Sequence, residues 1–501
     1  MTGSNHSKFS RRAMLGGGAA AGLAGLAGFA GLGGRRLRAA DMDAPDALPP
    51  EQRKLLFVVS AIGGASIIDS FLPVTTDEVG DTDLSSRLDA YPDYLVEQPE
   101  GSNIRCVAPI GSYFVYSNSY ALPTFLERHY QDMVVMTHEG TSVNHSVAQK
   151  RALTGAGVNK GRTIGEAVAE VQGRGLALPN VNMAIGGYVE PGDDPSVPSF
   201  ARAEIVADPV MLALSSHGSR GVLGAPTDGR MAQVRGVRDR LDQVSPFGQT
   251  FRESSQLQRY LAARGNAAPK LEELDLITKL MVLPQDQLPP EYGLSSSPLA
   301  ADLPLAFNFL ATDKWEQKAA VAFLLAYYGL SATSTFSLSY EPAFHDADVV
   351  GTPLAFDYSH TDHRIAQNVM WGRTARVIDG LISLLKFYDY MGDPALGKMW
   401  DRSLIYVATD FGREKVRPSG SSGWGTAHHL NNGSLLISPM LKGNRVYGGV
   451  DPTTLLTYGF DPRTGDPEPG RLQREGDVYS LVAQTMGVEF DERRDMSGLI
   501  R

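Results

Sequence analysis

Acidic residues follow short apolar runs of this sequence, at positions where strands would end. The run Leu404–Thr409 is followed by Asp410 and a Phe-Gly-Arg turn, and the run Leu55–Val59 leads through two glycines to Asp69. Short runs that are apolar throughout are typical of strands buried on both faces. In α/β sheets, ligand sites lie at the carboxyl edge of such strands. We therefore expect Asp69 and Asp410 to lie at one edge of a sheet.

Histidines and a further acidic residue occur in two later groups. Asp357, His360 and His363 precede a helical pattern, and His428 and His429 follow a Gly/Ser-rich loop. Carboxylates and imidazoles at such positions predict a site for a divalent metal. We expect zinc first, because imidazole together with carboxylate suits zinc, whereas a carboxylate-rich set would also bind manganese, magnesium or calcium.

His145 and Ser146 are candidates for a catalytic role. They lie between the apolar run Met133–Met136 and a helix expected over Ala148–Leu153. The start of a helix attracts anions through its dipole and its free N–H groups. His145 could therefore meet an anionic substrate, or it could only cap the helix.

Each candidate also has a purely structural interpretation. Asp69 would serve equally well as a helix N-cap or turn residue, and one histidine alone is more often structural. The set as a whole favours a site, because seven of the ten histidines fall in loops that border it. They are His138, His145, His345, His360, His363, His428 and His429.

Cysteine content and charge exclude other kinds of site and partner. Cys106 is the only cysteine, so neither an intramolecular disulfide nor a cysteine-based zinc knuckle can form. The formal net charge is −10, which argues against a nucleic-acid partner, because phosphates call for a basic face.

The first forty residues differ from the rest in composition. Arg11 and Arg12 precede an Ala/Gly/Leu-rich run from Gly16 to Gly34, as in a twin-arginine export signal, with Met14 where phenylalanine is usual. A membrane anchor is the alternative, although the many glycines make the run only weakly apolar. We expect export to the periplasm or beyond, the twin-arginine translocase as a partner, and membrane attachment only if the signal is retained.

The remaining chain alternates strand and helix patterns, which predicts an α/β fold. Residues 1–43 are interpreted as signal and linker, and residues 44–501 as one domain with a helical insertion around 228–300. Asn180–Pro198 is rich in glycine and proline and is interpreted as a loop, and the chain from Gly443 to the last expected helix is interpreted as turn-rich. The other expected elements are strands over Lys54–Ser60, Met133–Met136, Ser331–Tyr340 and Ser434–Ser438, and helices over Thr163–Val171, Trp315–Tyr328, Ile365–Leu385 and Asp477–Met486.

Several of these motifs resemble, in order and spacing, an exported bacterial family called domain of unknown function 1501. That family is similar to the alkaline phosphatase and sulfatase superfamily. The resemblance implies an alkaline phosphatase-like sandwich, with a large mixed, mostly parallel sheet between helices. It also implies a metal site and the hydrolysis of phosphate or sulfate esters. The motifs are Gly63-Gly64 with Ser66, Asp69, Phe71 and Pro73; Asn144-His145 with Thr154-Gly155; Asp357 with His360; and Asp410-Phe411-Gly412-Arg413 with the later histidines.

The sequence departs from that superfamily at the expected nucleophile. In sulfatases the nucleophile lies nine residues before a Thr-Gly pair, and counting back from Thr154 reaches His145, with Ser146 beside it. A histidine there could ligate metal, transfer protons or accept a phosphoryl group. Ala427 also stands where an acidic residue usually precedes the histidine, and the Asp357 to His360 spacing is one residue longer than usual.

Two functions follow from these patterns. The first is an exported metal-dependent hydrolase acting on a small-molecule or polymer-linked ester. The second is a non-catalytic exported protein that keeps the fold and serves in binding or scaffolding. In the first, Asp69, Asp357, His360, His363, Asp410, His428 and His429 are the expected metal ligands.

Overall fold

The computed structural model describes most of the chain after the expected export signal. That signal lies outside the described residues, as do His345 and most of the Gly/Ser-rich loop before His428. Among the described helices, none combines the length and apolarity needed to cross a bilayer. The described residues are 46–80, 87–110, 120–215, 224, 226–254, 257, 261, 274–338, 356–417 and 424–501.

The chain separates into two compact units. One comprises residues 41–208 and 318–501, and the other contains residues 209–317. The second unit includes the region predicted as an insertion, and its described helices are α6 (Pro209–Ser215), α7 (Asp228–Val244), α8 (Pro246–Thr250), α10 (Leu276–Lys279) and α11 (Leu303–Ala306). The candidate site belongs entirely to the first unit. The extent of the domain and its insertion stays a prediction.

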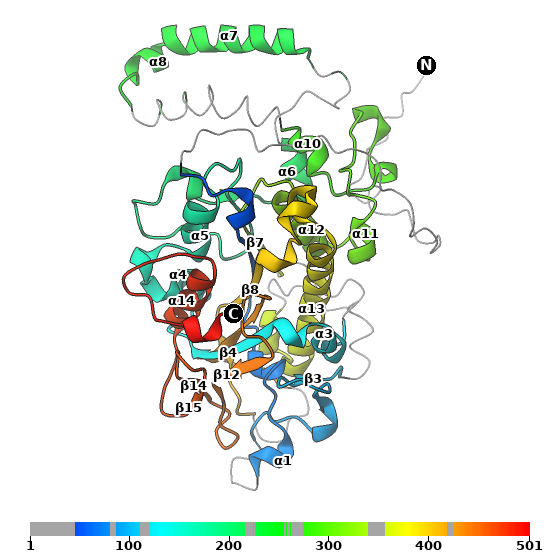
Figure 1. Ribbon diagram of the computed structural model, residues 1–501, viewed down its shortest axis with the longest axis vertical. Coiled ribbons are helices and arrows are strands. Elements are labelled where there is room, and N and C mark those ends of the chain that lie inside the picture. Colours follow the sequence, from blue (N-terminus) through cyan, green and yellow to red (C-terminus); the bar gives the residue numbers. More distant parts are fainter. Residues whose placement is uncertain are drawn as a thin grey trace, which may run out of the picture. The chain divides into compact units, whose positions relative to one another are not determined.

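An eight-stranded sheet forms the core of the first unit (Figure 1). Its order is β12-β4-β11-β8-β1-β7-β5-β6. Strand β11 runs antiparallel to both of its neighbours, and the other neighbouring pairs are parallel. The strands are β1 (Leu55–Ala61), β4 (Met133–Glu139), β5 (Asn180–Met183), β6 (Glu204–Ile205), β7 (Thr333–Ser337), β8 (Ser403–Thr409), β11 (Asn431–Ile437) and β12 (Arg445–Tyr447).

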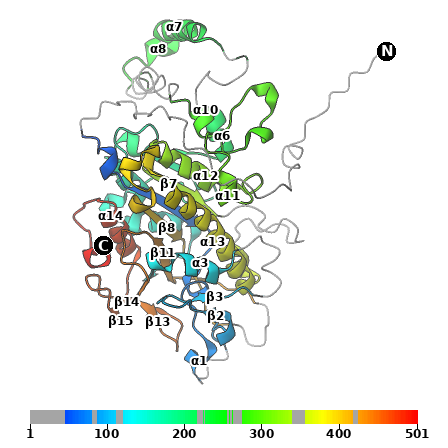
Figure 2. The same ribbon diagram turned by 45° about the vertical axis from the view of Figure 1, so that its right-hand side comes forward.

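Helices cover both faces of this sheet. Figures 1 and 2 show α4 (His145–Thr154), α5 (Ile164–Gln172) and α14 (Glu475–Thr485) on one face, and α3 (Leu122–His129) and α13 (His363–Phe387) on the other. On the first face, apolar side chains of the helices pack on those of β1 and β8. The predicted fold class, α/β with a large mixed, mostly parallel sheet between helices, is confirmed.

The two central strands were expected from their composition. All seven residues of β1 and all seven of β8 are buried, as predicted for strands covered on both faces. The long helix predicted near His363 is confirmed as α13, whose N-cap Asp362 accepts a hydrogen bond from the Ile365 amide at 3.3 Å. Capping by aspartate is the reason the helix begins at this residue.

Two predictions about loops were wrong. The expected loop Asn180–Pro198 begins with β5, which pairs in parallel with β6 and β7. The glycines and prolines that suggested a loop lie after β5, whose Asn180 and Asn182 are buried and donate hydrogen bonds to the carbonyls of Ala201 and Tyr188. The stretch after Gly443, interpreted as turns, contains β12, β13 (Gly449–Val450), β14 (Thr457–Phe460) and β15 (Pro467–Glu468).

Candidate metal centre

His145 is the first residue of α4 and lies beside the carboxyl end of β8. The side chain of Asn144 caps this helix by accepting a hydrogen bond from the Val147 amide. The Nδ1 atom of His145 lies 2.7 Å from Asp410 Oδ2, and its Nε2 atom lies 3.5 Å from Asp357 Oδ1. Because an ionised carboxylate only accepts hydrogen bonds, Nδ1 must donate to Asp410. In the neutral ring, the lone pair of Nε2 then faces Asp357.

Asp410 is buried and holds His145 rather than joining the ligand group. Its Oδ1 accepts the Gly64 amide at 2.7 Å, and its Oδ2 accepts the Gly63 amide at 3.2 Å. Both glycines have positive φ, and a Cβ on Gly64 would lie 2.6 Å from Arg413 Nε. The Gly-Gly pair is therefore required, because the backbone must approach both the carboxylate and the arginine closely.

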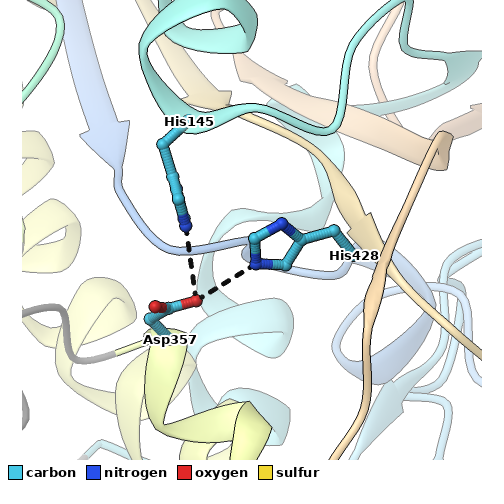
Figure 3. A group of neighbouring side chains, drawn as sticks. All are labelled: His145, Asp357 and His428. Atoms are coloured by element: carbon cyan, nitrogen blue, oxygen red, sulfur yellow. Dashed lines mark ion pairs between the residues drawn. The ribbon is translucent and has the colours of Figure 1, made fainter.

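Asp357 and His428 complete a group of three with His145 (Figure 3). Asp357 and His360 belong to the 3-10 helix Phe356–His360, and His428 belongs to β10 (His428–His429), which pairs with β9 (Gly412–Arg413). The His428 Nε2 atom lies 3.5 Å from Asp357 Oδ1. Its Nδ1 atom lies 2.9 Å from the Val143 carbonyl and therefore donates a hydrogen bond to it. In the neutral ring, Nε2 is then unprotonated.

These three side chains fit a metal ion. One ligand atom from each of His145, Asp357 and His428 lies within 4.8 Å of the other two. Two unprotonated imidazole nitrogens and a carboxylate oxygen face one another here. Their lone pairs repel unless a proton or a cation lies among them. Zinc-binding histidines usually donate their second ring N–H to a carboxylate or a carbonyl, as His145 and His428 do here. Three protein ligands with a further open position are typical of catalytic zinc sites.

His360 borders this group from the exposed side. Its Nε2 atom lies 3.2 Å from Asp357 Oδ1 and 2.8 Å from His428 Nε2. Its side chain is 44% exposed, more than that of the two other histidines. Burial and the Arg413 cation lower the pKa of His360. The neutral ring is therefore available to exchange protons with solvent or a bound molecule.

Arg413 is a buried cation that sequence patterns did not single out as part of the site. Its Nη2 atom donates to Asp357 Oδ1 at 2.7 Å and also contacts the Gly63 carbonyl. Burial would raise the pKa of the Asp357 carboxyl, but its contacts with His145, His428 and Arg413 hold it well below its usual range. Asp357 is therefore an anion at neutral pH, as a metal ligand must be. Arg413 stood in the quoted Asp-Phe-Gly-Arg motif, so its position was visible even though its role was not.

Asp69 and His363 form a separate group, so the predicted seven-ligand pocket is not what the structure contains. Their partners are Asp89 and Lys415. His429 joins neither group, because its Nδ1 atom accepts the Asn431 amide at 3.1 Å. The ligands divide in this way because side chains at one sheet edge can point to different sides of the loops that carry them. A shared edge therefore does not bring them into one group. The described residues thus contain two groups able to hold a cation, in place of one.

Ser146 lies on α4 beside a surface cavity. The cavity has a volume of about 260 Å³ and is also lined by Lys150, Arg151 and Glu190. No hydrogen bond joins the Ser146 hydroxyl to the three-residue group among the described contacts. Its predicted catalytic role stays a prediction.

We expect Asp410→Asn to weaken zinc binding by roughly 10- to 100-fold, the range found when partners of metal-binding histidines are removed. The amide has one oxygen and cannot accept from Gly63, Gly64 and His145 together. Competition with a chromophoric zinc chelator measures the affinity. Asp451→Asn is the control, because Asp451 only accepts hydrogen bonds in an exposed turn. Equal affinity in both variants would show that Asp410 does not orient a ligand.

Zinc binding should also depend on pH through His145. Burial would lower the pKa of this ring, but hydrogen bonds and charge from Asp357 and Asp410 raise it to about 9. Protonated His145 thus stabilises the metal-free fold. This contribution is complete below the ordinary histidine pKa of 6.5 and is lost as pH rises through about 9.

Zinc must displace that proton from His145, so the zinc affinity should rise about tenfold per pH unit up to about pH 9. Titrations with zinc across this range, repeated with His145→Gln, check it. A flat profile for the unmodified chain would contradict it.

Comparisons with known proteins give no family assignment. No protein-family model matches the sequence, and no curated protein matches it. Among solved structures, Ps i-CgsB in complex with k-i-k-neocarrahexaose is 10% identical, with 88% of this chain and 73% of that chain covered and a TM-score of 0.29. A phosphonate monoester hydrolase from Silicibacter pomeroyi is 12% identical, with 87% and 74% covered and a TM-score of 0.29. Likenesses at this level do not establish a shared activity.

Proposed function

We propose that this protein is an exported metal-dependent hydrolase of phosphate or sulfate esters. One observation carries the proposal: His145 Nε2, His428 Nε2 and Asp357 Oδ1 converge, while hydrogen bonds hold the far side of each histidine. Zinc fits these donors best, with manganese, magnesium or calcium as alternatives. A divalent cation bound there would neutralise charge on the ester oxygens and activate water.

The side chains of the site divide the remaining tasks. Asp410 orients His145 and keeps its Nε2 lone pair pointed at the site. Buried Arg413 fixes the Asp357 oxygen that the histidines share. His360, at the exposed rim, is neutral and is placed to take a proton from the attacking water, which is the role of a general base. In this arrangement His145 is a ligand, and the reaction needs no covalent intermediate.

Membership of the family called domain of unknown function 1501, and so of the alkaline phosphatase-like superfamily, belongs to the same proposal. It rests on the motifs, of which Gly63-Gly64, His145, Asp357 and Asp410 meet at one place in the structure. Export by the twin-arginine translocase rests on the first forty residues alone. The substrate is a small-molecule or polymer-linked ester.

Metal content and turnover test the function together. The exported chain, His428→Ala and His429→Ala are compared for bound zinc and for hydrolysis of aryl phosphate and aryl sulfate esters. The adjacent His429 is a matched control, because it lies outside the group. We expect only His428→Ala to lose both metal and turnover. Metal without turnover in the unmodified chain would favour the binding or scaffolding alternative, and absence of metal would refute the hydrolase.

A further inference from the structure

The second group of ligand-type side chains is buried away from solvent. Asp69, Asp89 and His363 are each at most 1% exposed. His363 Nε2 lies 3.1 Å from Asp69 Oδ2 and 3.3 Å from Asp89 Oδ2. Zinc ligands at about 2.0 to 2.2 Å from one ion lie roughly this far from each other. The three side chains therefore have the spacing of a metal site.

Two atoms of this group lack hydrogen bonds. They are His363 Nε2 and Asp89 Oδ2, both fully buried and both directed into the group. Buried polar atoms are nearly always paired, so such a pair of unpaired atoms calls for a physical reason. A metal ion among the three side chains would be one reason. A fixed charge inside the group is the other.

Lys415 supplies that fixed charge. Its ammonium group contacts Asp69 Oδ2 and lies 3.1 Å from Ser66 Oγ, and its side chain is 4% exposed. Arg364 pairs with the other oxygen of Asp89 at 2.8 Å. Two carboxylates therefore face two cations, and with a neutral His363 the charges already balance. A divalent metal would add two uncompensated positive charges to a buried group, at a large cost.

We propose that Lys415 is a built-in cation that closes a latent metal site formed by Asp69, Asp89 and His363. The chain then binds metal only at the surface group, which consists of His145, Asp357 and His428. The residue at position 415 sets the number of metal ions that the chain can hold. This inference goes beyond the proposed hydrolase and does not depend on it. Removing the ammonium leaves two carboxylates, one arginine and an imidazole, a group with a net negative charge of one, so a divalent cation bound there leaves one uncompensated positive charge in place of two.

Zinc binding to Lys415→Met tests the inference in a His428→Ala background, where the surface group is disabled. Protein is equilibrated with zinc, desalted and analysed for metal. We expect about one zinc per chain in the double variant and almost none in His428→Ala alone. Lys415→Arg in the same background is the control, because it keeps the positive charge and should bind none. No zinc in the methionine variant, or equal zinc in the arginine variant, would overturn the inference.

Zinc-dependent folding of the double variant is a second test of the latent metal site. If His428→Ala/Lys415→Met is unfolded after purification without metal, zinc should restore a cooperative unfolding transition, because metal binding to a folded site is folding free energy. Failure of zinc to restore it would refute the latent site. Because His428→Ala already removes the surface site, neither result is affected by whether the chain is a hydrolase.

Discussion

Asp357→Asn is expected to abolish measurable turnover and to lower zinc affinity by more than about 100-fold, beyond the range found for partners outside the ligand shell. Asp357 Oδ1 is the atom that all three neighbouring histidines approach, at 3.2 to 3.5 Å. An amide oxygen keeps the shape but loses the charge that a divalent cation needs. Bound zinc and the hydrolysis of an aryl phosphate, measured on the same preparation, check this result.

A stability control separates loss of metal from loss of fold. Asp357→Asn also weakens the ion pair with buried Arg413, so some fall in unfolding free energy accompanies the loss of zinc. Asp389→Asn removes only a partly exposed pair with Lys398 and should change neither zinc nor turnover. Full turnover in a folded Asp357→Asn protein would exclude the proposed centre.

Asp69→Asn should lower the unfolding free energy by about 3 to 5 kcal/mol, the cost of breaking a buried ion pair by removing one partner. Burial would raise the pKa of Asp69, but the charge of Lys415 and the contact with His363 hold it well below its usual range. Asparagine cannot compensate Lys415, which stays buried beside it. Urea unfolding followed by circular dichroism measures the change, with the midpoint compared at a constant slope.

The matched control for this prediction is an exposed ion pair. Glu78→Gln breaks the pair between Glu78 and Arg105, whose side chains are 40% and 31% exposed, and should cost about 0 to 1 kcal/mol. A loss of similar size in Asp69→Asn and Glu78→Gln would mean that the buried group is solvated and that Lys415 is not its fixed counter-ion.

Local patterns were enough to predict the framework of the fold. Apolar composition located β1 and β8, and the apolar stripe from Ile365 to Leu385 located α13. The motifs also placed His145, Asp357 and Asp410 together, because strand ends and the turns after them share one sheet edge. These features depend on interactions close in sequence or on burial that composition reveals.

The division of the candidate ligands could not be predicted in this way. Whether Asp69 shares a cation with Asp357 depends on where each side chain points and on which counter-ions fill the space. Asp89 lies in a polar, irregular stretch and gave no signal. Arg413 and Lys415 did give a signal. They follow Asp410 and are two residues apart, so in an extended segment both cations would lie on one side, facing the sheet edge that carries the acidic residues.

The order of the central strands constrains how the chain can fold. Strand β1 pairs with β8 through Leu55–Ser403 to Ala61–Thr409, so the middle of the sheet joins the early and late parts of the sequence. Contacts of such long sequence separation form slowly. During synthesis, β1 cannot pair with β8 until most of the polypeptide has left the ribosome. A chain threaded through a membrane as it emerges would separate these two strands, whereas translocation after synthesis would keep them together.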